Sequence, residues 1–193
     1  MADSSSLIFI SGGVRSGKSS FAEKIAADEA ALRKAGLHYI ATAQISDTEM
    51  KERVAHHRTD RLNSGHIWKT WEQPVRLLEL ANSFDSHDIV LLDCLTTLLN
   101  NEFFKADMQW KDHLFQECII QSILAGITQI KSNCQLLIIV SNEVLNDSTQ
   151  NNELVLTYQK MLGELHQHIV SMAEQAFLVE SGIPLAMKGA DCL

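Results

Sequence analysis

Short apolar segments alternate along the chain with longer segments in which apolar side chains recur every three or four residues. The short segments are rich in Ile, Leu and Val and predict buried strands at Leu7–Ile10, His38–Ala41, Ile89–Leu92, Gln135–Val140 and Ala176–Val179. The longer segments predict helices at Lys18–Arg33, Asp47–Leu62, Pro74–Ala81, Asp107–Ile130 and Asn152–Ala173. Strand followed by helix, repeated, predicts an α/β fold with a mostly parallel sheet and helices on both faces.

Two further segments complete this picture. Ile67–Glu72 is a candidate extended piece, and the polar stretch Asn146–Asn152 predicts a long loop. The sequence contains no repeats and no linker-like stretch, so we expect residues 1–193 to form a single domain, with a loose tail over residues 1–6. Ligands of open α/β sheets bind at the carboxyl ends of the strands, which directs attention to the loops after Ile10, Ala41 and Leu92.

Composition and charge narrow the possible partners. Of the 193 residues, 46% are apolar and 21% charged, as in an ordinary folded domain, and the formal net charge is −8. Scattered Lys and Arg argue against a nucleic-acid or anionic-membrane surface, so a bound phosphate must be held locally. The acidic start MADSSS and the short uncharged stretch Cys118–Ile130 predict no membrane span and a cytoplasmic location.

The cysteines predict neither a metal site nor a disulfide framework. The spacing of metal-binding cysteines is missing, which favours reduced, mostly buried thiols at Cys94, Cys118, Cys134 and Cys192.

One motif carries a strong chemical signal because it lies between a predicted strand and a predicted helix. The residues from Gly12 to Ser19 match GxxxxGK[ST], so the domain is expected to be P-loop NTPase-like. In such a loop, glycines let the backbone N–H groups turn toward phosphates. Lys18 is expected to contact the terminal phosphates as a catalytic residue, and Ser19 to bind Mg²⁺. The predicted nucleotide-binding residues of this loop are Gly12, Gly13, Val14, Arg15, Ser16, Gly17, Lys18 and Ser19.

A carboxylate at the end of another apolar strand is the usual second part of such a site. Asp93 ends the strand Ile89–Leu92 and is therefore the candidate for organising Mg²⁺. Asp is also a favoured N-cap, so Asp93 could instead cap a helix that starts at Cys94. The two interpretations can hold together.

A histidine lies on the predicted helix Asp47–Leu62. Glu49, Arg53, His57 and Arg61 follow one another at four-residue spacing and share one stripe of that helix. A neutral imidazole between two guanidinium groups is suited to attack a nucleotide phosphate. A structurally incidental surface histidine remains the alternative from the pattern alone.

Taken together, the motifs resemble a known family of enzymes. GGVRSGKS, YIATAQ, DTEMKERVAHHRTDR, WKTWEQP, VLLDCLTTLLNN and VSNEV follow one another in this order. The chain is thereby similar to the bifunctional adenosylcobinamide kinase/adenosylcobinamide-phosphate guanylyltransferases of cobalamin biosynthesis. The resemblance implies a P-loop α/β fold, a homotrimer, a corrinoid substrate, Mg²⁺, and GTP and ATP as substrates. It implies phosphorylation of adenosylcobinamide, then transfer of GMP from GTP through a guanylyl-histidine to give adenosylcobinamide-GDP.

The resemblance also assigns roles to particular residues. The family pattern R-[IV]-x-x-H-[RK] corresponds to Arg53–Arg58 and selects His57 as the guanylylated catalytic residue. It implies nucleotide contacts, beyond the phosphate loop, from Thr42, Ala43, Gln44, Arg58, Thr59, Asp60, Arg61, Glu72 and Asp93.

The last third departs from the family pattern. Leu145 stands where relatives usually have Gly, and the stretch Leu156–Lys160 lacks the Arg residues found in relatives. Two alternatives therefore stay open beside the bifunctional enzyme: a single-activity nucleotidyltransferase or small-molecule kinase of this fold, and a non-catalytic nucleotide-binding regulatory protein.

Overall fold

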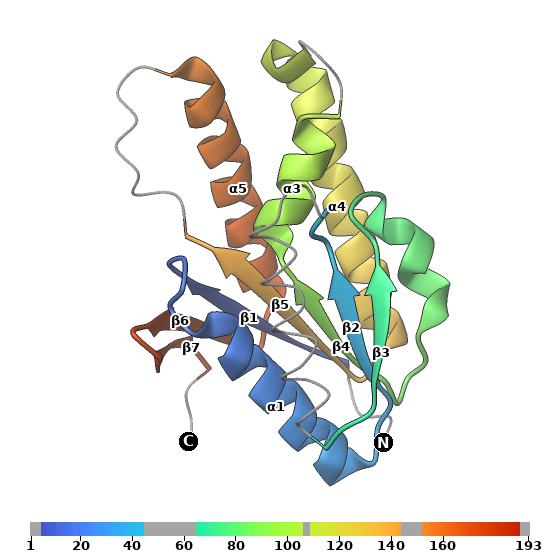
Figure 1. Ribbon diagram of the computed structural model, residues 1–193. Helices are drawn as coiled ribbons and strands as arrows, with labels where there is room; N and C mark the ends of the chain where they lie inside the picture. Colours follow the sequence, from blue (N-terminus) through green and yellow to red (C-terminus); the bar gives the residue numbers. More distant parts are fainter. Residues whose placement is uncertain (1–4, 45–64, 106–108, 144–151, 190–193) are drawn as a thin grey trace.

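A seven-stranded sheet in the order β3-β2-β4-β5-β1-β6-β7 forms the centre of the protein (Figure 1). The computed structural model describes residues 5–44, 65–105, 109–143 and 152–189. Neighbouring strands are parallel except for β7, which runs antiparallel to β6. The strands are β1 (Ser6–Gly12), β2 (Leu37–Ala41), β3 (Trp68–Glu72), β4 (Ile89–Asp93), β5 (Leu136–Asn142), β6 (Gln175–Glu180) and β7 (Ile183–Lys188).

Helices cover both faces of the sheet, as the sequence predicts. Helix α1 (Lys18–Arg33) lies on one face, and α3 (Leu95–Phe103), α4 (His113–Asn133) and α5 (Glu153–Met172) lie on the other (Figure 1). Two 3₁₀ helices, η1 (Leu77–Ser83) and η2 (Gln109–Lys111), accompany the second group. Within the residues that the structure describes, no helix has both the length and the apolar composition needed to cross a membrane.

The inner strands β1, β2, β4, β5 and β6 are apolar on both faces because each face belongs to a different core. In β1, Leu7 and Phe9 pack in the cluster with α3, α4 and α5, whereas Ile8 and Ile10 pack in the cluster with α1. Helix α1 presents alanines to the sheet at four-residue spacing, which lets its backbone approach closely. Successive side chains of a strand point to opposite faces, so a strand buried on both sides reads as a continuous apolar run.

Two predicted helices have different forms. The predicted helix Pro74–Ala81 is wrong in type and start: Arg76 adopts a left-handed conformation with φ 53°, and the 3₁₀ helix begins after it at Leu77. The predicted helix Asp107–Ile130 is not continuous. Asp112 is extended and accepts a hydrogen bond from the Leu114 backbone, so it starts α4 as its N-cap and separates it from η2.

The ends of the predicted elements also shift. Strand β1 begins at Ser6, inside the tail expected to be loose, and Ile67–Glu72 forms β3 as a parallel edge strand. The sequence pattern does not predict β7, whose apolar run is short. The predicted helix Asp47–Leu62 lies outside the described residues, as does the predicted loop Asn146–Asn152 except for Asn152, which is the N-cap of α5.

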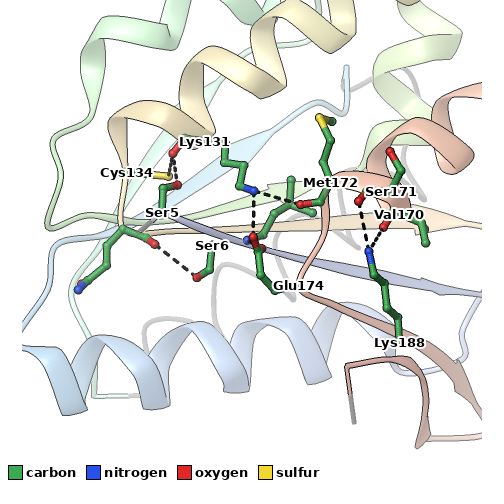
Figure 2. Close-up of polar contacts among 11 residues, drawn as sticks. Ser5, Ser6, Lys131, Cys134, Val170, Ser171, Met172, Glu174 and Lys188 are labelled. Carbon is green, nitrogen blue, oxygen red and sulfur yellow. Dashed lines mark hydrogen bonds and ion pairs between the residues drawn. The ribbon is translucent and has the colours of Figure 1, made fainter. Parts of the chain in front are cut away.

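Charged side chains tie the carboxyl end of α5 to the amino end of the sheet (Figure 2). Lys188 Nζ donates to the backbone carbonyls of Val170 at 2.7 Å and Ser171 at 3.2 Å, and Lys131 Nζ donates to that of Met172 at 3.0 Å. These carbonyls belong to the last turn of the helix, where cations also interact favourably with the helix dipole. Glu174 accepts from Lys131 and from the backbone N–H of Leu7, which links this cluster to β1.

Glu174→Gln is expected to destabilise the fold at neutral pH and to have a smaller effect in acid. Burial raises the pKa of the Glu174 carboxyl, but the hydrogen bonds from Leu7 and Lys131 outweigh it and hold that pKa below its usual 4.5. A carboxyl whose pKa is lower in the folded state stabilises above its unfolded pKa, and this contribution disappears as the pH falls through the folded value.

Urea denaturation of the wild type and variant at pH 7, 5 and 3 measures this difference. Glu164→Gln, at an exposed position of α5, is the matched control and is expected to change little at any pH. A Glu174→Gln effect as large at pH 3 as at pH 7 would contradict the assignment.

Candidate nucleotide-binding site

The glycine-rich loop joins β1 to α1 and turns sharply at two residues. Arg15 has φ 62° and Gly17 has φ 92°, both in the left-handed region. Helix α1 begins directly afterwards at Lys18, and its first turn contains no acidic residue. The positive end of the helix dipole is therefore uncompensated where the loop ends, which favours an anion there.

Lys18 lies inside this loop rather than extending into solvent. Its side chain is buried, and Nζ donates to the Gly13 carbonyl at 3.1 Å, while the Ser16 backbone N–H donates to the same carbonyl at 3.2 Å. The Ser16 hydroxyl is also buried and has no hydrogen-bond partner among the described residues. A buried ammonium and a buried unpaired hydroxyl in one loop are the donors that a phosphate group satisfies.

Close approach of neighbouring strands requires glycine at two loop positions. A Cβ at Gly12 would lie 2.4 Å from the Val179 carbonyl oxygen and 2.7 Å from the Ser16 hydroxyl, and one at Gly17 would lie 3.3 Å from the Gly182 Cα. At Gly13, by contrast, no heavy atom lies within 4 Å of an added Cβ. Packing therefore favours glycine at both positions, and at Gly17 the left-handed backbone, with φ 92°, favours it as well.

The other predicted nucleotide contacts in the described part of the chain lie along the same edge of the sheet. Gly12 ends β1 in register with Asn142 of β5, and Asp93 ends β4 in register with Ala41 of β2. Glu72 ends β3 and is exposed. Strand β5 lies between β1 and β4. The edge formed by the carboxyl ends of the strands therefore runs from the phosphate loop past β5 to Asp93, and then to the segments after β2 and β3.

Asp93 occupies the place expected of a metal-organising carboxylate. Its Oδ2 accepts a hydrogen bond from the Tyr39 hydroxyl at 3.2 Å. The capping alternative is wrong, because the N-cap of α3 is Cys94. Burial raises the pKa of the Cys94 thiol, Asp93 raises it further, and Lys18 lowers it, so both charges act on this one buried thiol.

The donor set at this edge fits magnesium. The Ser19 hydroxyl and the Asp93 carboxylate are hard oxygen ligands, and Mg²⁺ commonly takes one or two such ligands together with substrate phosphates and water. In the four described stretches, no group of three or more His, Cys, Asp and Glu side chains is arranged for a metal. Phosphate oxygens of a bound nucleotide would complete the coordination of a magnesium ion at Ser19 and Asp93.

Thr42 holds the end of β4 in place. Its side chain is fully buried, and Oγ1 donates to the Cys94 carbonyl at 2.9 Å and accepts from the Cys94 backbone N–H at 2.8 Å. The Thr42 carbonyl accepts from Asn101 Nδ2 at 2.9 Å. Of the three predicted contacts in this segment, Ala43 is half-buried and Gln44 is exposed.

A buried polar network that the sequence pattern does not predict supports the centre of the edge. The Ser141 hydroxyl contacts the Thr96 hydroxyl at 2.9 Å and His166 Nε2 at 2.8 Å, and the Tyr158 hydroxyl donates to the Thr96 carbonyl at 2.8 Å. Burial lowers the pKa of His166 to about 4, so the ring is neutral at pH 7. Tyr158 lies in the stretch Leu156–Lys160 that departs from the family pattern, and His166 follows on the same helix; together they anchor α5 to α3 and β5.

The predicted nucleophile is not part of this geometry. The structure describes neither His57 nor its helix, and the neighbouring predicted contacts Arg58, Thr59, Asp60 and Arg61 likewise lie outside the described residues.

A mostly parallel sheet with helices on both faces, and a glycine-rich loop between β1 and α1 that contains a buried lysine, define a P-loop nucleotide-binding protein. A solved ATPase domain has a similar fold, with a TM-score of 0.50 and 12% identity over 91% of this chain and 69% of that domain. Residues 8–187 match the family model described as cobinamide kinase / cobinamide phosphate guanyltransferase. The chain belongs to this family of enzymes.

Curated relatives align with this chain over nearly their whole length. The bifunctional adenosylcobalamin biosynthesis protein CobU of Escherichia coli strain K12 is 31% identical, with 94% of this chain and 99% of the relative aligned. The bifunctional adenosylcobalamin biosynthesis protein CobP of Pseudomonas aeruginosa is 35% identical, with 93% of this chain and 96% of the relative aligned.

Gly12→Ala is expected to lower the thermal stability of the ligand-free protein, because the new methyl group overlaps the Val179 carbonyl. Overpacking of this kind costs about 1–3 kcal/mol, a shift of several degrees in Tm. Gly13→Ala is the matched control, since its methyl group meets open space, and its Tm is expected to stay close to the wild type. Equal melting temperatures for the two variants would show that β6 does not press on the loop.

Proposed function

We propose that this protein phosphorylates adenosylcobinamide with a nucleoside triphosphate and then transfers GMP from GTP to adenosylcobinamide phosphate, giving adenosylcobinamide-GDP. Membership of the cobinamide kinase / cobinamide phosphate guanyltransferase family supports both reactions. The single structural observation that carries the proposal is the buried Lys18 in a glycine loop, at the same sheet edge as Asp93. That edge is where a triphosphate and the hydroxyl that attacks it must meet.

In the kinase step, the residues of the phosphate loop position the triphosphate. Lys18 and the N–H groups at the start of α1 bind the β- and γ-phosphate oxygens, and their positive charge stabilises the charge that develops there. The substrate hydroxyl oxygen attacks the γ-phosphorus, the bond to the β,γ-bridging oxygen breaks so that the nucleoside diphosphate leaves, and the hydroxyl proton passes to solvent. Ser19 and Asp93 would hold Mg²⁺ together with phosphate oxygens of the nucleotide, and the ion would neutralise part of the phosphate charge.

In the guanylyltransferase step, the proposed nucleophile is His57. A nitrogen of its neutral imidazole attacks the α-phosphorus of GTP, a P–N bond forms, and pyrophosphate leaves. A phosphate oxygen of the phosphorylated corrinoid then attacks the same phosphorus, the P–N bond breaks, and the diphosphate linkage forms. Arg58 and Arg61 are proposed to stabilise the phosphoryl charge, and Ala43, Gln44 and Glu72 to contact the nucleotide.

The proposal includes a homotrimeric assembly in the cytoplasm, which family resemblance supports. Light scattering of the purified protein measures the assembly, and a monomeric mass would count against it.

The covalent intermediate is the first prediction to test. Incubation with Mg²⁺ and GTP labelled at the α-phosphate is expected to leave label on the denatured protein that is labile in acid and stable in base, as a phosphorus–nitrogen bond requires. His57→Ala is expected to abolish this label and His56→Ala, its matched neighbour, to retain it. Label lost in His56→Ala but kept in His57→Ala would reassign the nucleophile, and no label in a wild type that binds GTP would restrict the protein to the kinase step.

Lys18→Ala is expected to weaken both activities, whereas His57→Ala is expected to spare phosphorylation of adenosylcobinamide. Loss of one charge-assisted contact to phosphate costs about 1.5–3 kcal/mol, or roughly a tenfold to hundredfold loss of triphosphate affinity. Kinase assays with labelled γ-phosphate, beside calorimetric titration of the nucleotide, separate the two variants. Equal loss of kinase activity in His57→Ala would contradict this division of roles.

A further inference from the structure

The turn between β6 and β7 has a backbone that only a few residue types adopt readily. Ser181 has φ 51° and Gly182 has φ 80°, so both central residues are left-handed. Two successive left-handed residues form the tight hairpin turn whose twist matches that of the flanking strands. The conformation fixes the direction in which the Gly182 N–H points.

This N–H donates to the phosphate loop. Gly182 N lies 2.8 Å from the Ser16 carbonyl oxygen, and the Gly182 Cα is only 3.3 Å from the place of a Cβ on Gly17. Strand β6 reinforces the contact, because its Val179 is in register with Gly12 at the start of the loop. The hairpin turn therefore packs directly against the loop, although more than one hundred and sixty residues separate them in the sequence.

The contact fixes the orientation of the peptide group that binds phosphate. In a planar trans peptide the C=O and N–H bonds point in opposite directions. Since the Ser16 carbonyl points at the turn, the N–H of the next residue, Gly17, points away from the turn and across the loop. Without the Gly182 donor, this peptide loses the hydrogen bond that holds its carbonyl on the side of the turn, and a flip that presents the carbonyl to phosphate becomes less unfavourable.

We infer that Gly182 is a positioning residue for triphosphate binding: its backbone N–H holds the Ser16–Gly17 peptide so that the Gly17 N–H faces the phosphate oxygens. On the other flank, the Glu143 backbone N–H donates to the Gly12 carbonyl at 3.0 Å, so the loop is held from β5 as well. The inference rests on the proposed function only as far as the binding of a triphosphate by this loop.

Gly182→Ala and Gly65→Ala form a matched pair for the test. Gly182 has φ 80° and Gly65 has φ 74°, and at both positions an added Cβ meets no heavy atom within 4 Å. The two substitutions therefore introduce the same kind of backbone strain without a clash. Gly65 precedes the amino end of β3, at the edge of the sheet opposite the phosphate loop.

Calorimetric titration with Mg²⁺ and the non-hydrolysable β,γ-methylene analogue of GTP measures the effect. The Gly182→Ala variant is expected to bind the analogue roughly tenfold more weakly than the wild type, as for loss of one hydrogen bond to a charged group. The Gly65→Ala variant is expected to bind the analogue as the wild type does, although its Tm falls by about as much as that of Gly182→Ala. Replacement of Gly182 by glycolic acid, which exchanges only the N–H for an ester oxygen, is expected to give the same loss without strain.

The outcomes distinguish the inference from the proposed function. A wild type that does not bind the analogue would overturn the proposed function itself. A wild type that binds, with affinity unchanged in the ester variant or lowered equally in both alanine variants, would overturn the role of Gly182. Weaker binding in Gly182→Ala and in the ester variant, but not in Gly65→Ala, would establish it.

Discussion

The proposed phosphate site depends on the strand that leads into the glycine-rich loop, because that strand is hydrogen-bonded on both sides. Strand β1 pairs with β5 and with β6, and Gly12 at its end is in register with residues of both. The formal net charge of the chain is −8, so the overall charge of the protein repels a polyanion at long range. Attraction has to come from oriented backbone N–H groups, one helix end and Lys18, and fixed orientation is what the paired strands supply.

The strand between β1 and β4 sets the size of the site. Because β5 is inserted there, Lys18 and Asp93 are associated with strands two positions apart, a separation of about 9.5 Å between strand axes. This space suits phosphates and a hydrated cation between the lysine and the carboxylate. The Thr42 contacts with Cys94 keep the far side of the space in place, and the Ser141 network supports its centre.

The sequence predicts those parts of the molecule that depend on neighbouring residues. The apolar runs and the GxxxxGK[ST] motif are local, so the strands, α1 and the place of Asp93 at a strand end follow from them. Strand order, the insertion of β5 and the contact of Gly182 with the loop depend on pairing between distant segments, which periodicity does not encode. His57 stays a prediction, since it lies outside the described residues.

The hydrogen bond from Gly182 has a consequence for biosynthesis of the chain. The loop leaves the ribosome before its supports do, because these come from β5 and from the β6–β7 turn, which follow it in the chain. Such distant pairings close large loops and form late in folding. A nascent chain therefore has no complete phosphate site until the hairpin has emerged, and nucleotide cannot stabilise shorter folding intermediates through this site.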